Sequence, residues 1–353
     1  MDELRDVFAS PGSAYRGKPF WAWNGKLEAD ELRRQIRVMH RMGLGGFFMH
    51  SRVGLATAYL SEEWFRMVDA CVDEARKLEM EAWLYDEDRW PSGAGGGLVT
   101  CDPEYRHRNL LVVTCAPEEA AFDSEPLAMF SAVIEGPNAT QVRRLPEDWD
   151  GTVEPAGAQV LAFFVKTDEP SSWYNDATYL DTLSHEAVRR FIEVTHEAYR
   201  RETGQEFGRV VPGIFTDEPN HGGVHRKGGV EGREAVGVPW TGDLPEHFRE
   251  RYGYDILDHL PELFYRVDGR EQSQARWHYH DCKTFLFVDA FARQCYEWCE
   301  ENDLALTGHA LAERTLRSQS GVGGSAMRFY EFMQAPGIDQ LTEHWDEYTT
   351  AKQ

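Results

Sequence analysis

Carboxylate side chains that directly follow apolar segments are the residues of this sequence best suited to chemistry. Glu218 ends the run GIFTDE at 213–218 and is followed by a proline, while Glu313 and Glu343 come after later apolar segments. Cleavage of a glycosidic bond needs a carboxylic acid that protonates the leaving oxygen and a carboxylate that activates water or attacks the anomeric carbon. We therefore predict that Glu218 is the acid and that Glu343 or Glu313 is its partner.

Asp217 immediately precedes the predicted acid. Neighbouring side chains point in opposite directions on an extended backbone, so we expect one of the two carboxylates to act and the other to orient or bind.

Other polar and aromatic residues stand where apolar segments end, and they include no thiol nucleophile and no Ser-His-Asp order. Carboxylates, imidazoles and aromatic rings of this kind suit the binding of sugar hydroxyls and sugar faces. The predicted substrate-binding residues are Trp23, Asn24, His50, Arg52, Tyr85, Asp86, Asp217, His309, Asp339 and His344. For Trp21, Trp23 and Trp90, sugar contact and burial are both open, whereas Trp64 and Trp298 lie on expected helices and should pack in the core.

The acidic run at 86–88 has three interpretations: a cation site, a site for sugar hydroxyls, or a solvated turn. Hard oxygen ligands would favour calcium over zinc there, which makes calcium the expected cofactor if there is one. The sequence GAGGG at 93–97 lacks the Lys-Ser/Thr ending of a phosphate-binding loop. We interpret it as a flexible active-site loop.

Short apolar runs alternate with amphipathic stretches, an order typical of parallel strands joined by crossover helices. Strands are expected at 19–24, 45–50, 81–86, 210–215, 305–311 and 337–341, and helices at 28–42, 61–75, 184–203, 245–252, 274–302 and 326–334. The carboxyl ends of such strands converge on one face of a (β/α) barrel, which would bring the candidate residues together.

The α/β order is interrupted by β-rich runs at 110–115, 129–134, 141–145 and 159–166. We predict a (β/α)8-type (TIM) barrel, truncated after about six strands, formed by 1–105 and 172–353, with 106–171 as a small β-rich insertion after the third strand. The Gly-rich, charged segment 220–242 is expected to be a mobile loop or one tied to substrate entry.

The composition narrows the classes of partner. A formal net charge of −23, from 60 acidic and 37 basic residues, would repel nucleic acid and an anionic membrane surface. No signal peptide or apolar run of about 20 residues is visible, so a soluble, cytoplasmic protein is expected. Six cysteines in 353 residues form no dense disulfide framework, and Cys295 and Cys299 should be buried thiols on one helix face.

Several ordered motifs resemble the α-L-rhamnosidases of glycoside hydrolase family 106 and their relatives. The motifs are PFWAWN at 19–24, GGFFMHSRVGL at 45–55, YLSEEW at 59–64, LYDEDRWPSG at 84–93, FTDEP at 215–219, Gly308-His309 with Glu313, and PGID at 336–339. The resemblance implies an inverting hydrolase with a (β/α)8 catalytic domain, a calcium-assisted sugar site and further β domains downstream. It places Glu218 at the strand-four acid, and Glu313 and Glu343 where the second carboxylate or base lies.

The leading prediction is therefore a glycoside hydrolase that acts on terminal α-L-rhamnosyl or similar linkages. Alternatives are a retaining barrel glycosidase of the β-galactosidase or glucuronidase kind, a non-catalytic carbohydrate-binding fragment, and a metal-dependent hydrolase, which the lack of HxH spacing disfavours. Inversion would separate the two carboxyl groups by about 6.5–9.5 Å and retention by about 5–5.5 Å. The expected partner is a carbohydrate, and the open edges of an incomplete barrel would let copies of the chain pair.

Overall fold

The computed structural model describes residues 2–224, 226–340 and 352, and its central element is a six-stranded parallel sheet. The strands follow one another in the order β1 (Phe20–Trp23), β2 (Gly46–Ser51), β3 (Glu81–Tyr85), β8 (Gly213–Asp217), β12 (Ala305–His309) and β13 (Ala335–Pro336). The first five coincide with predicted strands. The sixth pairs with β12 at 335–336, just before the stretch 337–341 that the sequence favoured.

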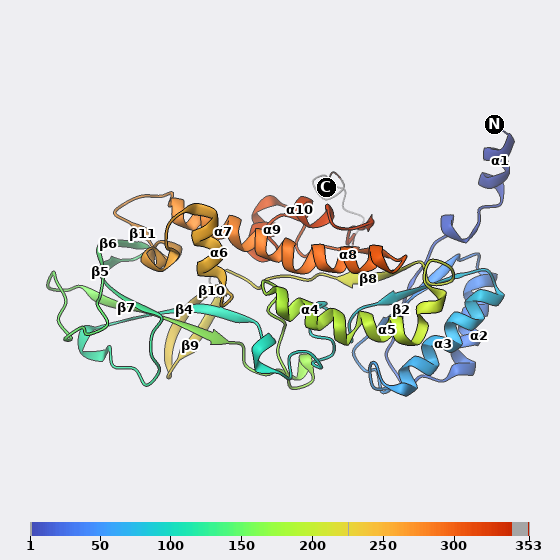
Figure 1. The fold of residues 1–353 in the computed structure, drawn as a ribbon, viewed down its shortest axis with the longest axis horizontal. Coiled ribbons are helices and arrows are strands. Elements are labelled where there is room, and N and C mark those ends of the chain that lie inside the picture. The colour runs from blue at the N-terminus through green and yellow to red at the C-terminus, as the bar shows by residue number, and fades with distance from the viewer. Residues whose placement is uncertain (1, 225, 341–351, 353) are drawn as a thin grey trace.

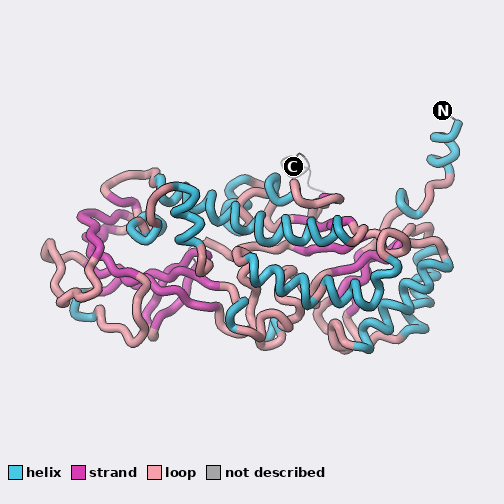
Figure 2. Tube along the Cα trace, viewed as in Figure 1, coloured by secondary structure: helices cyan, strands magenta, loops and turns pink. Residues whose placement is uncertain are grey.

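Helices line this sheet along its length, as Figures 1 and 2 show. They are α2 (Ala29–Arg41), α3 (Glu62–Lys77), α4 (His185–Val194), α5 (His196–Thr203), α7 (Gln274–Phe287), a π-helical turn (Val288–Arg293), α8 (Gln294–Glu301), α9 (Leu316–Val322) and α10 (Ala326–Tyr330). The local sequence determines where α3 begins. The Ser61 side chain caps the helix by accepting the Trp64 N–H at 3.2 Å, and acidic residues occupy the first turn. A further helix, α1 (Asp2–Ala9), stands away from the sheet near the N-terminus.

Alternation along the strands separates an outer face, under the helices, from an inner face. Trp23 of β1 points outward, where it is 2% exposed and its ring packs against Trp64 of α3 at 5.0 Å. Trp21 is buried beside it, and Trp64 and Trp298 lie in the core as predicted. All six cysteines are free, and Cys295 and Cys299 are buried, as expected for core thiols.

The inner face carries aromatic rings, and it is curled. Phe20 of β1 contacts Phe215 of β8 with ring centroids 4.6 Å apart, although β2 and β3 lie between these strands. A flat sheet would hold strands three positions apart at a distance of about 14 Å. Within the described residues, β1 and β13 remain the two edges of the sheet, so it is curled like part of a barrel without closing. Phe20 consequently stays 48% exposed.

A second, seven-stranded sheet lies at the other end of the molecule (Figure 1). Its order is β11 (Arg266–Val267), β6 (Asn138–Arg144), β5 (Ala128–Glu135), β7 (Gln159–Thr167), β4 (Arg108–Cys115), β10 (Arg233–Trp240) and β9 (Arg226–Val230). All neighbours pair antiparallel except β11 with β6. The four predicted β-rich runs are all present as strands.

Residues far along the chain complete this second sheet. β9 and β10 form a hairpin inside the segment 220–242, so the prediction of a mere loop there is wrong. The hairpin is stabilised because β10 pairs with β4 over five residues, a long-range contact that local composition does not reveal. Helix α6 (Leu244–Tyr252) follows. Buried side chains on one face of the second sheet join the core of the parallel sheet, whereas its other face carries a separate small cluster that includes Leu111, Ala162 and Phe164. None of the described helices combines the length and apolar character that crossing a membrane requires.

Candidate active site

Four inner-face side chains meet at the carboxyl ends of neighbouring parallel strands, around the carboxylate of Asp217 on β8. The Tyr85 hydroxyl on β3 donates to Asp217 Oδ2 at 2.7 Å, and His50 Nε2 on β2 lies 3.5 Å from the same oxygen. His309 Nε2 on β12 is 3.1 Å from Oδ1. The structure therefore brings together His50, Tyr85, Asp217 and His309, as the convergence of strand ends predicted.

This arrangement fixes the charge of Asp217. Burial alone would raise the pKa of Asp217, but contacts with His309, His50 and Tyr85 hold it well below its ordinary value. The carboxylate in turn raises the pKa of His309 above 6.5, although burial opposes this. Asp217 is thus an ionised anchor that orients two imidazoles and a phenol.

Glu218 has the opposite electrostatic character. Burial, followed by the negative charge of Asp217, raises the pKa of Glu218 from 4.5 to about 7. Two adjacent carboxyl groups are therefore driven to different protonation states near neutral pH. Separated pKa values of this kind are characteristic of acid–base pairs in active sites.

The backbone at Glu218 is in the left-handed region, with φ of 48°. Its N–H donates to the His309 carbonyl at 3.2 Å, and its own carbonyl accepts from the Asn220 side chain at 3.1 Å. The chain turns at Glu218, so the extended backbone assumed for the pair ends at Asp217. His309 Nε2 lies 3.1 Å from Asp217 Oδ1, and a ring nitrogen of His309 lies within 4.8 Å of a Glu218 oxygen. Strain of this kind in a non-glycine residue is concentrated at functional sites.

Two further carboxylates lie on the segments after β12. Glu313 is 5% exposed, and its carboxylate accepts from the Tyr330 hydroxyl and the Asp339 N–H, both at 2.9 Å. Burial raises the pKa of Glu313. Oxygens of Glu218 and Asp339 lie within 4.8 Å of each other. The predicted residues Glu343 and His344 fall outside the described part of the chain.

One cluster could hold a metal ion: Glu218, His309 and Asp339 place one ligand atom each within 4.8 Å of the others. Calcium takes six to eight oxygen ligands, whereas an imidazole with two carboxylates is a donor set more typical of a transition metal. These three residues alone therefore do not fit calcium.

The acidic run after β3 is buried rather than solvated, and a glycine loop surrounds it. Glu87 is 1% exposed, and its two oxygens accept backbone N–H groups from Asp88, Gly93, Gly95 and Gly96 at 2.5–2.9 Å. Positive φ values of 58° and 64° at Gly95 and Gly96 turn these N–H groups inward. The oxygens of Glu87 are thus already satisfied by protein donors and do not fit a cation.

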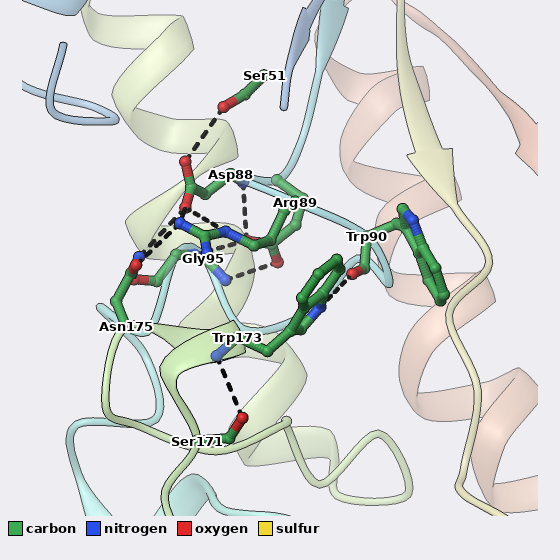
Figure 3. A network of polar contacts seen from close by, with 10 residues as sticks. Ser51, Asp88, Arg89, Trp90, Gly95, Ser171, Trp173 and Asn175 are labelled. Atoms are coloured by element: carbon green, nitrogen blue, oxygen red, sulfur yellow. Dashed lines mark hydrogen bonds and ion pairs between the residues drawn. The ribbon is translucent and has the colours of Figure 1, made fainter. Parts of the chain in front are cut away.

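The remaining acidic residues of the run are also engaged. Asp86 lies on the outer face, fully buried, and accepts from Ser92. Asp88 accepts from Ser51 at 3.1 Å, from Arg89 at 3.2 Å and from Asn175 at 3.1 Å (Figure 3). The structure places Asp86 away from the inner-face cluster and favours burial for Trp23. Asn24 and Arg52 are exposed beyond the ends of β1 and β2.

Sequence reasoning did not find the roles of Tyr330, Ser92 and the glycine cradle. Ser92 links the two strand ends, since its N–H donates to the Asp217 carbonyl and its Oγ accepts the Asp217 N–H, both at 2.8 Å. The spacing of glycines six to nine residues after Glu87 is the signal for the cradle in the sequence, although the composition of this segment by itself favours a flexible loop.

Comparison with solved structures supports this fold. A rhamnosidase from Novosphingobium sp. PP1Y is similar, with a TM-score of 0.64 and 16% sequence identity, covering 94% of this chain and 49% of that chain. The chain thus spans about half the length of the matched structure. The likeness at this identity concerns the fold. No family model and no curated protein matches the sequence.

Proposed function

We propose that the chain is the catalytic part of a glycoside hydrolase that cleaves terminal α-L-rhamnosyl linkages, or those of a closely similar sugar. The observation that carries the proposal is the pair Asp217 and Glu218 at the carboxyl end of β8, adjacent in sequence, with the pKa of Asp217 lowered and the pKa of Glu218 raised. The fold shared with a rhamnosidase supports the substrate class.

In the proposed reaction, Glu218 donates its proton to the glycosidic oxygen as the bond to the leaving group breaks. A carboxyl group with a pKa of about 7 remains partly protonated at neutral pH, which an acid requires. Asp217 stays ionised and orients His50, Tyr85 and His309, whose ring and hydroxyl groups bind sugar hydroxyls. Asn24, Arg52 and His344 are proposed as outer contacts.

A second carboxylate, Glu313 or Glu343, activates the water in an inverting reaction. Glu313 is held by Tyr330 and the Asp339 backbone, so its orientation is fixed. Calcium remains a proposal from the family resemblance, and no step of this mechanism depends on it.

One observation favours a retaining runner-up. The oxygens of Glu218 and Asp339 approach within 4.8 Å, which is nearer to the spacing of about 5–5.5 Å in retaining glycosidases than to the 6.5–9.5 Å that inversion needs. Asp339 would then be the nucleophile. NMR of the first-formed anomer separates the two: the anomer of the substrate indicates retention and the opposite anomer indicates inversion.

The same three-residue cluster supports a metal-dependent hydrolase as a second candidate. Metal analysis of the purified protein and assays with a chelator distinguish it. Stoichiometric transition metal, with activity lost on chelation and restored by the metal, would replace the acid–base proposal.

The direct test is hydrolysis of an aryl α-L-rhamnoside and an aryl β-galactoside by the wild type and by Glu218→Gln. Glu231→Gln is a matched control, because Glu231 also has a positive φ, of 51°, but is exposed on the second sheet. We expect turnover of the rhamnoside, a large loss in Glu218→Gln and wild-type rates in the control. Turnover that survives Glu218→Gln would refute the acid assignment, and sugar binding without turnover would indicate a binding module.

A further inference from the structure

Two tryptophans, Trp90 and Trp173, form a pair that the mechanism above does not use. Trp90 follows β3, and Trp173 belongs to a 3-10 turn (Ser172–Tyr174) that comes after β7. Their ring centroids are 5.8 Å apart at an angle of 66°, and the Trp173 indole N–H donates to the Trp90 carbonyl at 2.8 Å. Figure 3 shows the two rings side by side, with Trp90 toward the β8 strand.

Polar contacts hold the Trp173 side of the pair in place. The Arg89 guanidinium lies 6.0 Å from the centre of the Trp173 ring and is held by Asp88 at 3.1 Å and by Asn175 at 3.0 Å. The Ser171 side chain accepts the Trp173 N–H at 3.1 Å. These contacts, drawn in Figure 3, fix an aromatic surface of which Trp90 remains 37% exposed. An ordered, exposed indole beside a polar site is more typical of a binding surface than of a core residue.

The position of the pair relative to Glu218 is set by the backbone. Ser92, two residues after Trp90, exchanges two hydrogen bonds of 2.8 Å with the backbone of Asp217, which immediately precedes Glu218. The Trp90 segment and the proposed acid are therefore anchored to the same turn at the end of β8. An acid that protonates the glycosidic oxygen has the cleaved sugar on one side and the leaving group on the other.

We propose that Trp90 and Trp173 form a subsite for the sugar ring of the leaving group, and that this sugar is neutral. The inference rests on the proposed function, because it takes Glu218 as the acid and the inner-face cluster as the site of the cleaved sugar. Indole faces bind the apolar faces of pyranose rings by stacking and burial of carbon-bound hydrogens. The guanidinium of Arg89, already paired with Asp88, offers no free cation to an acidic sugar.

The kinetic test compares a substrate with a leaving-group sugar and one without. An α-L-rhamnosyl-glucose disaccharide and α-L-rhamnosyl fluoride are assayed with the wild type, Trp90→Ala, Trp90→Phe and the control Trp277→Ala, whose indole is 66% exposed on α7. We expect the ratio of kcat/KM for the disaccharide to that for the fluoride to fall about tenfold in Trp90→Ala. Trp90→Phe should restore most of it, and Trp277→Ala should leave it unchanged. An unchanged ratio in Trp90→Ala would overturn the subsite.

A binding measurement separates failure of the subsite from failure of the proposed function. Calorimetric titration of the disaccharide into Glu218→Gln and into Glu218→Gln/Trp90→Ala needs no turnover. About tenfold weaker binding in the double variant supports the subsite even if neither substrate is hydrolysed. Absence of hydrolysis alone would contradict only the proposed function. Equal affinity in the two variants overturns the subsite, provided that thermal unfolding shows both variants to be folded.

Discussion

Replacing Glu218 with glutamine is expected to stabilise the protein while it removes the proposed acid. Burial, then the charge of Asp217, raises the pKa of Glu218 from 4.5 to about 7. Between these two pH values the unfolded chain releases the proton and the folded protein keeps it. Glu218 therefore costs no stability below pH 4.5, and its cost grows as pH rises and levels off above pH 7.

The magnitude follows from the rise in the pKa of Glu218 from 4.5 to about 7. At about 1.4 kcal/mol per unit, the upper bound is about 3.4 kcal/mol, and partial solvent exposure reduces it to about 2 kcal/mol. Glutamine is uncharged at every pH. Glu218→Gln should thus be about 2 kcal/mol more stable than the wild type at pH 8 and nearly equal to it at pH 4.5.

Urea denaturation at pH 4.5, 6 and 8 measures this directly. Asp217→Asn is the opposite case, because contacts with His309, His50 and Tyr85 lower the pKa of Asp217 against the effect of burial. Its ionised form stabilises the fold above the usual pKa, so Asp217→Asn should lose stability at pH 8. Glu231→Gln, the exposed control, should show no gain. A Glu218→Gln gain that does not change with pH, or a loss at pH 8, would refute the electrostatic argument.

The other predictions concern protonation and buried charge. The kcat/KM of the wild type on an aryl rhamnoside should fall above pH 7 as Glu218 ionises, and a rate that keeps rising to pH 9 would exclude it as the acid. Burial raises the pKa of Glu87 to about 7, although its carboxylate accepts four N–H groups of the glycine cradle. Glu87→Gln places an amide NH2 against these donors and should reduce the free energy of unfolding in urea by about 3 kcal/mol at pH 4.5, and by less at pH 8, where glutamine also removes a buried charge; an equal loss at both values would contradict this. Lys283 is fully buried, its Nζ has no hydrogen-bond partner in the described chain, and burial lowers its pKa to about 7. The cost of burying the charged ammonium group is nearly full at pH 7 and falls as the pH rises toward 10.5. Lys283→Met should therefore raise the free energy of unfolding by about 2–4 kcal/mol at pH 7 and by less at pH 10. An equal gain at both pH values would contradict this.

The parallel strands and their polar ends were predictable because each strand carries its own signal. Apolar runs at 45–50 and 305–311, each closing on or near a histidine, gave β2 and β12, and strand convergence then gave the cluster at Asp217. The protonation state of Glu218 was not predictable, because it depends on a left-handed backbone and on burial by residues distant in sequence.

Longer-range pairing accounts for the rest. β9 and β10 have glycines and charges that favour a loop locally, and only pairing with β4 makes them a hairpin in the second sheet. The glycines at 93–97 indicate conformational freedom in the sequence, yet the buried Glu87 fixes them. In both cases the conformation depends on a contact with another segment, and the local sequence pattern does not predict that contact.

The curled inner face has a practical consequence for work in solution. Phe20 is 48% exposed although it packs against Phe48, His50 and Phe215, so the folded chain presents part of an aromatic cluster to water. Environment-sensitive apolar dyes bind such surfaces, and their fluorescence is commonly taken as a sign of a molten globule. A native sample of this chain should therefore be bright with such a dye while its near-UV circular dichroism stays intact, and dye-based melting curves should begin from a high baseline.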